Sequence, residues 1–200
     1  MKKTLFLFLI IIPLFMHAQQ PKMHIKLIAG VNTTSFVYRI ENVDPDVLVG
    51  WEAGAGIRVS KRNAFLEGNI SYINHGLSVN INGENDTIFD PISVRMNSLE
   101  IPLLIGYIPV KKPLFKWYVY SGLVNSFSLK GRLSYRGEVI KFSPHEFDLH
   151  TYNLGWRFGT QIDIAMVNFD FNYTIGMTNA FKGDIRTNSH SFQLNIGYLF

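Results

Sequence analysis

The sequence contains no cysteine, only eight prolines, and charged residues at just 17% of its 200 positions. The lack of cysteine excludes a disulfide scaffold, a cysteine-ligated zinc site and thiol catalysis. Hydrophobic residues make up 47% of the chain, which excludes disorder outside the loops. The formal charge is +4, or +2 without the two lysines of the leader described next, and so small a surplus does not indicate a nucleic-acid partner.

The N-terminus has the pattern of a secretory signal peptide. Lys2 and Lys3 precede an apolar run over residues 5–12, and Ala18 lies just before Gln19 and Gln20. The run is shorter than the roughly 20 residues that a membrane-spanning helix needs, so an export signal is favoured over an anchor. We expect residues 1–18 to be the signal peptide and 19–200 to form one β-barrel domain.

Strict alternation of apolar and polar residues dominates the rest of the chain. It is clearest over 152–164, 167–177 and 192–200, and recurs over 23–31, 51–59, 66–72, 99–107 and 115–127. Because side chains alternate faces along a strand, this period predicts eight strands. Short links (60–63, 109–113, 165–166) alternate with long ones (34–48, 82–91, 130–148, 178–189). The prediction is an all-β fold, an eight-stranded antiparallel transmembrane up-and-down β-barrel with short periplasmic turns and long extracellular loops.

The bulk of the apolar face favours a membrane barrel over a soluble periplasmic lipid-binding barrel. Trp51, Trp117 and Trp156 lie on that face, whereas the polar face is rich in small residues that fit a narrow interior. Tyr198 and Phe200 end the last strand on the apolar face, as in the signal that barrel-assembly machinery recognises. We therefore expect an outer-membrane location in a Gram-negative cell envelope. The expected partners are outer-membrane lipids, the assembly machinery and a protein at the extracellular loops.

Two groups of residues are candidate functional sites. The polar face should bring a charge network into a closed lumen, formed by Lys26, Glu52, Arg58, Glu67, Glu100, Lys116, Arg157, Asp163 and Asp170. We expect the strands over residues 66–81 and 92–107 to pair with no bulge. In the expected register, the numbers of two paired residues sum to 173. Beyond the bilayer, the apolar positions of this hairpin change face and should form a patch at the barrel mouth, as a lid or a binding site. It comprises Leu77, Val79, Ile81, Ile92, Val94 and Met96.

The sequence offers no strong catalytic pattern. It has no metal-ligand spacing, no phosphate-binding loop and no paired-carboxylate signature, so no cofactor or metal is expected. A hydrolase site would need a serine, a histidine and an aspartate close together. The candidates are Ser143 or Ser189, one of His145, His150 and His190, and Asp148, but their spacing does not support such a site. We expect a non-enzymatic protein. A lipid-modifying barrel enzyme is the alternative.

Several segments carry a family resemblance that spans nearly the whole mature chain. They are residues 26–32, 71–76, 99–107, 118–122 and 197–200, of which the Leu-Glu-Ile-Pro-Leu run from Leu99 is the most specific. With these segments the chain resembles the Bacteroidetes outer-membrane β-barrel family of PorT-like proteins. The resemblance implies the barrel fold and the outer membrane and, for function, assistance in protein export. In the same run, Pro102 should interrupt the strand ladder.

Overall fold

The computed structural model describes residues 21–37, 43–81, 92–135, 138–143, 150–178 and 188–200. The expected signal peptide lies outside these residues. The strands are β1 (Lys22–Val37), β2 (Val43–Lys61), β3 (Ala64–Ile81), β4 (Ile92–Lys111), β5 (Phe115–Tyr135), β6 (Glu138–Phe142), β7 (Tyr152–Ile164), β8 (Val167–Gly176) and β9 (Asn188–Leu199). Within this part of the chain, no helix is long and apolar enough to cross a membrane.

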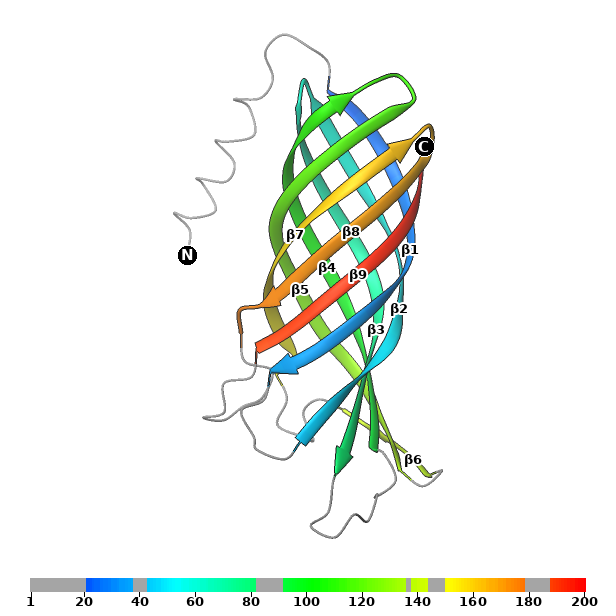
Figure 1. The fold of residues 1–200 in the computed structure, drawn as a ribbon, viewed down its shortest axis with the longest axis vertical. Coiled ribbons are helices and arrows are strands. Elements are labelled where there is room, and N and C mark those ends of the chain that lie inside the picture. Colours follow the sequence, from blue (N-terminus) through cyan, green and yellow to red (C-terminus); the bar gives the residue numbers. More distant parts are fainter. Residues whose placement is uncertain (1–20, 38–42, 82–91, 136–137, 144–149, 179–187) are drawn as a thin grey trace.

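Eight of the strands form a closed antiparallel barrel, as predicted (Figure 1). Neighbours in sequence pair with each other, β9 pairs with β1, and β4 with β5 completes the ring. Following paired residues around the barrel from Ser60 of β2 leads back to Gly50 of the same strand, a stagger of ten residues. Such a stagger tilts the strands and leaves an interior that side chains fill.

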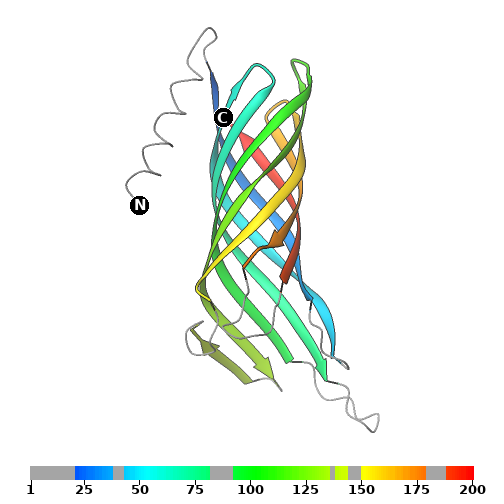
Figure 2. The ribbon, with the colours of Figure 1, turned by 90° about the vertical axis from the view of Figure 1, so that its left-hand side faces the viewer.

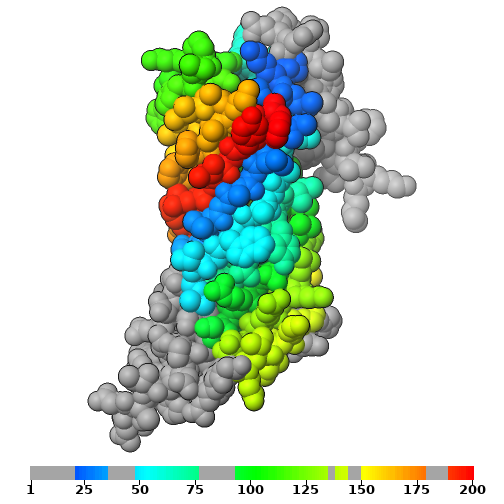
Figure 3. Space-filling model, turned by 90° about the vertical axis from the view of Figure 1, so that its right-hand side faces the viewer, coloured from blue at the N-terminus to red at the C-terminus, as the bar shows by residue number. Residues whose placement is uncertain are grey.

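The ends of the barrel differ. Tight turns join β2 to β3 and β7 to β8 at the end where the chain's C-terminus lies, at the top of Figure 1. At the other end, β2 to β5 continue beyond β1 and β7–β9, and β6 pairs with β5 (Figures 1 and 2). We call this part, residues 43–48, 76–81, 92–97, 130–135 and 138–142, the sheet extension. Figure 3 shows it protruding below β1 and β9.

The extension corrects the expected loops. Much of 34–48 and of 130–148 was predicted to be irregular, but β1 reaches Val37, β2 begins at Val43, and β6 is an additional strand. Two register shifts explain why the sequence pattern missed these strand segments. One lies in β2 between Leu48 and Trp51, and the other lies in β5, opposite Asn97 and Ser98 of β4. Each bulge moves the following residues to the other face, so the strand continues where the alternation breaks.

The β3–β4 pairing also corrects a prediction. The register is unbroken from Ala64 opposite Tyr107 to Val79 opposite Ile92, as expected, but paired numbers sum to 171 rather than 173. A slip of two residues keeps every side chain on its face, so alternation alone does not distinguish the two registers. The ladder has a gap opposite Pro102, where the missing N–H was expected to interrupt it.

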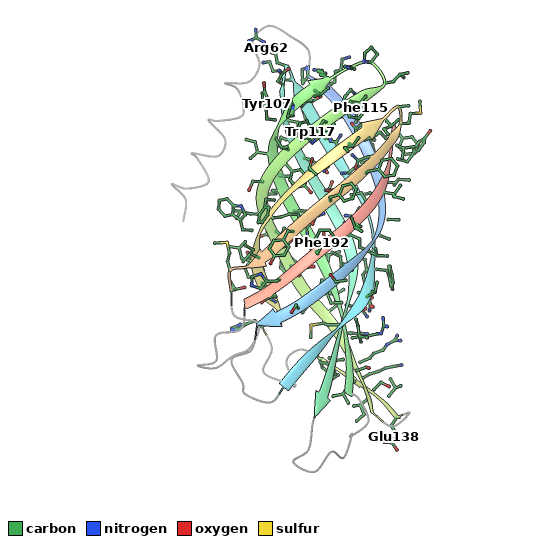
Figure 4. All side chains as sticks on the ribbon, viewed as in Figure 1. Arg62, Tyr107, Phe115, Trp117, Glu138 and Phe192 are labelled. Carbon is green, nitrogen blue, oxygen red and sulfur yellow. The ribbon has the colours of Figure 1, made fainter. Side chains whose placement is uncertain are left out.

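The barrel is apolar outside and polar inside. Trp51 and Trp156 are each 49% exposed, whereas buried charges line the lumen. Tyr107, Phe115, Trp117 and Phe192 stand on the outer surface (Figure 4). This arrangement suits a wall in contact with lipid and excludes a soluble barrel with an apolar binding cavity.

Candidate functional site

The lumen contains most of the predicted charge network. Eight of the nine residues named from the sequence are buried: Lys26, Glu52, Arg58, Glu67, Glu100, Arg157, Asp163 and Asp170. Lys116 is the exception, because it is only half-buried and makes no ion pair among the residues that the structure describes. Six of these buried charges form two ion-paired groups, whereas Glu52 and Asp170 make no ion pair among the described residues.

Glu67 is the centre of the first group. Nζ of Lys26 donates to its Oε1, and Nε of Arg58 donates to its Oε2 at 2.6 Å. Nη1 of Arg58 also donates to Oδ2 of Asp163, at 2.9 Å, so one guanidinium links β2, β3 and β7. Because an unpaired buried charge is costly, this pairing is what allows four fully buried charged groups to coexist.

Arg157 is the centre of the second group. Its Nη2 donates to Oε2 of Glu100 at 2.6 Å, and its Nε donates to Oγ1 of Thr174 at 2.8 Å. His75, which the sequence did not single out for this group, places Nε2 at 3.8 Å from Oε1 of Glu100. Nδ1 of His75 and Oγ1 of Thr34 form a hydrogen bond of 2.9 Å. This group therefore lies closer to the sheet extension than the first.

Neutral side chains complete the network, and the sequence did not identify them. The hydroxyl of Tyr120 donates to Oδ1 of Asp170 at 2.6 Å, and Nε2 of Gln161 donates to Oδ2 of the same carboxylate at 3.2 Å. Nδ2 of Asn168 donates to Oδ1 of Asp163 at 2.6 Å. Their positions on the polar faces were the available signal, but their partners depend on the register.

An apolar cluster closes the lumen at the end with the tight turns. It consists of Phe65, Leu104, Ile108, Tyr118 and Tyr120. The guanidinium carbon of Arg58 lies 4.4 Å from the ring centroid of Tyr118, so the cluster also packs directly on the first charge group. Together the cluster and the ion pairs fill the interior, which makes an open pore incompatible with this packing.

The predicted mouth patch falls on the sheet extension. Register places Val94 opposite Leu133 and Met96 opposite Gly131, and the ring of Phe142 covers Gly131. These positions lie on the face that continues the lumen wall, where Val94 and Met96 are half-buried. The side chains of Leu77, Val79, Ile81 and Ile92 lie outside those that the structure describes, so the role of the patch stays a prediction.

Neither a metal centre nor a hydrolase site emerges from the described residues. No group of three or more histidine, cysteine or acidic side chains there is arranged to hold a metal. Nδ1 of His190 hydrogen-bonds to the hydroxyl of Tyr173 at 2.7 Å on the outer face, away from the lumen. His145 and Asp148 lie outside the described residues.

The apolar wall, filled lumen and paired strands define the class of an outer-membrane β-barrel protein. Within that class, the chain belongs to the outer membrane protein beta-barrel domain family, whose model matches residues 17–182. No curated protein sequence matches the chain.

Solved structures of outer-membrane proteins have a similar fold. Ail, the attachment invasion locus protein of Yersinia pestis, is 12% identical, with a TM-score of 0.50 over 90% of this chain and 99% of that one. OprG from Pseudomonas aeruginosa is 14% identical, with a TM-score of 0.48 over 90% and 97%. The neisserial surface protein NspA is 10% identical, with a TM-score of 0.49 over 91% and 100%. At these identities the likeness concerns the fold alone.

Proposed function

We propose that the protein is a structural or interaction component of the outer membrane that acts through its sheet extension, with PorT-like assistance to protein export as the specific version. The single observation that carries the proposal is the continuation of β2 to β5 beyond a filled barrel, with β6 added at the edge. Because the lumen is filled, we assign the function to the outer surface of the molecule. The tight turns at the opposite end correspond to the periplasmic side in barrels of this type.

The two faces of the extension support an interaction role. Val94 and Leu133 lie opposite each other on one face, whereas their neighbours Ser93 and Ser134 lie opposite each other on the other. An apolar face outside the bilayer is stabilised by contact with another surface, either this chain's own loops or a protein partner. The export role follows from the family resemblance and rests on segments such as residues 99–107.

Neighbouring substitutions on opposite faces give a direct test. Val94→Asp places a charge on the apolar face, and Ser93→Asp places the same charge one residue away on the other face. In cells lacking the gene, Ser93→Asp should restore export, whereas Val94→Asp should leave exported proteins in the periplasm. Periplasmic and medium fractions would be compared by mass spectrometry, with folding of each variant checked by gel mobility before and after boiling. Normal secretion in the deletion strain would reject the export role.

The lipid-modifying alternative has a separate readout. The same deletion strain should keep its lipid A and phospholipid profiles if the protein is not an enzyme. A changed profile, restored by the wild-type gene but not by His150→Ala, would contradict the non-enzymatic proposal. His150 is the exposed histidine just before β7 and is within the described chain.

A further inference from the structure

Four exposed cations lie together on the outer face of the sheet extension. Register places Arg95 of β4 opposite Arg132 of β5, and Arg132 opposite Lys141 of β6. Lys130 lies two residues from Arg132 on the same strand, opposite Asn97. Residues opposite each other on neighbouring strands have Cβ atoms about 4.5–5.5 Å apart, so three like charges form one continuous row.

The bulge in β5 is what aligns this row. Along the barrel, the outward residues of β5 have odd numbers, such as Leu123 and Phe127. Pairing with β4 shifts by one residue at Leu129, since Ser98 pairs with Ser128 whereas Asn97 pairs with Lys130. After the shift, the even-numbered Lys130 and Arg132 share the outward face with Arg95. Without it they would lie on the apolar face.

The row has no anionic partner within the described chain. Among the residues that the structure describes, none of the four cations forms an ion pair. Nη1 of Arg95 donates a hydrogen bond to Oδ1 of Asn74, a neutral acceptor, at 3.2 Å. Like charges directly opposite each other repel, so an external anion would stabilise this arrangement.

The position of the row relative to the lipid-facing wall indicates which anion. Arg95 lies on the same face of β4 as Leu99, Ile101 and Leu103, which belong to the apolar outer wall. Leu99 lies four positions along β4 from Arg95, a distance of about 13 Å along a strand. A lipid whose acyl chains contact the wall therefore has its headgroup beside the cations, since the headgroup layer directly adjoins the hydrocarbon.

We propose that Arg95, Arg132 and Lys141, with Lys130 beside them, form a binding site for the phosphate groups of the outer-leaflet glycolipid, lipopolysaccharide. Guanidinium groups bind phosphate oxygens through two parallel hydrogen bonds, and the lysines add point charges at the edge. The site lies on the face opposite to the apolar patch, so its function is independent of the protein-interaction role proposed above.

Lipid retention by purified protein tests the site. The wild-type protein, folded in a neutral detergent, would be titrated with diphosphoryl lipid A and with the same lipid after enzymatic removal of both phosphates, and bound lipid counted by native mass spectrometry. The triple variant R95Q/R132Q/K141Q removes the row. A matched triple, K22Q/K111Q/K112Q, removes three exposed cations at the opposite end of the barrel. Gel mobility before and after boiling verifies that each variant is folded.

We expect the wild-type and matched-control proteins to retain diphosphoryl lipid A and the row variant to bind it about tenfold more weakly or worse. Dephosphorylated lipid should bind all three proteins equally weakly. Equal retention by the row variant and the control, or equal binding of both lipids by the wild type, would overturn the proposal. Displacement of lipid A by an equimolar amount of inorganic pyrophosphate would overturn the lipid assignment in favour of a soluble anion. If the row variant does not fold, the single variants R132Q and K141Q replace it, each with a smaller expected loss.

Discussion

Arg58 and Glu67 stand directly opposite each other on β2 and β3, and Nε of Arg58 donates to Oε2 of Glu67 at 2.6 Å. The same guanidinium reaches Asp163 of β7 at 2.9 Å. The Arg58 guanidinium thus connects strands β2, β3 and β7 across the lumen, although β7 is distant from the other two in sequence. When Arg58 is replaced, Asp163 loses the guanidinium and Glu67 keeps Lys26 as its one remaining ion-pair partner among the described residues. Arg58 should therefore dominate the stability of the lumen.

Arg58→Gln should lower the free energy of unfolding by about 3–5 kcal/mol, since it leaves buried carboxylates incompletely paired. Lys112→Gln, which removes an exposed cation from the turn before β5, should change it by less than about 0.5 kcal/mol. Urea unfolding in lipid vesicles, followed by tryptophan fluorescence, measures both. A loss below about 1 kcal/mol for Arg58→Gln would mean that the charge network contributes little to stability.

Alternation along the strands was enough to predict which charged residues enter the lumen, because the two-residue period is local. Lys26, Glu67 and Glu100 were assigned to the correct face for this reason. Their contacts were not predictable in the same way. Arg58 and Asp163 are 105 residues apart in sequence and meet only because the stagger of the closed barrel brings β2 and β7 to the same level.

The sheet extension was harder to predict, because bulges reverse the alternation. Leu48 has an even number and Trp51 an odd number, yet their partners Gly76 and Asn74 lie two residues apart on β3, so the register shift places both on the same face. β6 is only five residues long, and its adjacent Val139 and Ile140 give no alternation. A pattern search of the kind used for the barrel strands therefore identifies neither the extent of β2 nor the existence of β6.

Outward polar side chains in the wall should be stabilised by each other. Nε1 of Trp156 donates to Oγ of Ser121 at 2.6 Å, and water is absent from the hydrocarbon layer that faces them. Ser121→Ala should therefore destabilise the protein by about 1 kcal/mol. In a double-mutant cycle with Trp156→Phe, the coupling energy should be about 0.5–1.5 kcal/mol. Additive effects of the two substitutions would show that the hydrogen bond contributes nothing in lipid.

Close strand packing makes one glycine of the wall much less replaceable than another. A Cβ at Gly122 would overlap the carbonyl oxygen of Leu103, which belongs to the backbone and does not move aside. At Gly68 the nearest atom would be Cδ2 of the same leucine, at 3.5 Å, an ordinary contact. Gly122→Ala should cost about 1–3 kcal/mol, as overpacking does. Gly68→Ala should be close to neutral. Folding yield into vesicles and urea midpoints compare the pair, and equal effects would refute the assigned packing.

The filled interior predicts that the barrel does not conduct ions. An ion crossing the lumen would have to pass the apolar cluster around Phe65 and Tyr118 and then separate Arg58 from Glu67. Breaking such a buried pair costs several kcal/mol before the ion has shed its own hydration. In planar bilayers, the folded protein should therefore give no more current steps than a boiled sample at the same concentration. The combined variant Phe65→Ala/Arg58→Ala removes both barriers. If a substitution opens the lumen to ions, this variant is the one that should show current steps. Regular current steps from the wild-type protein would show that the lumen opens, and the charge network would then have to be understood as part of an ion path.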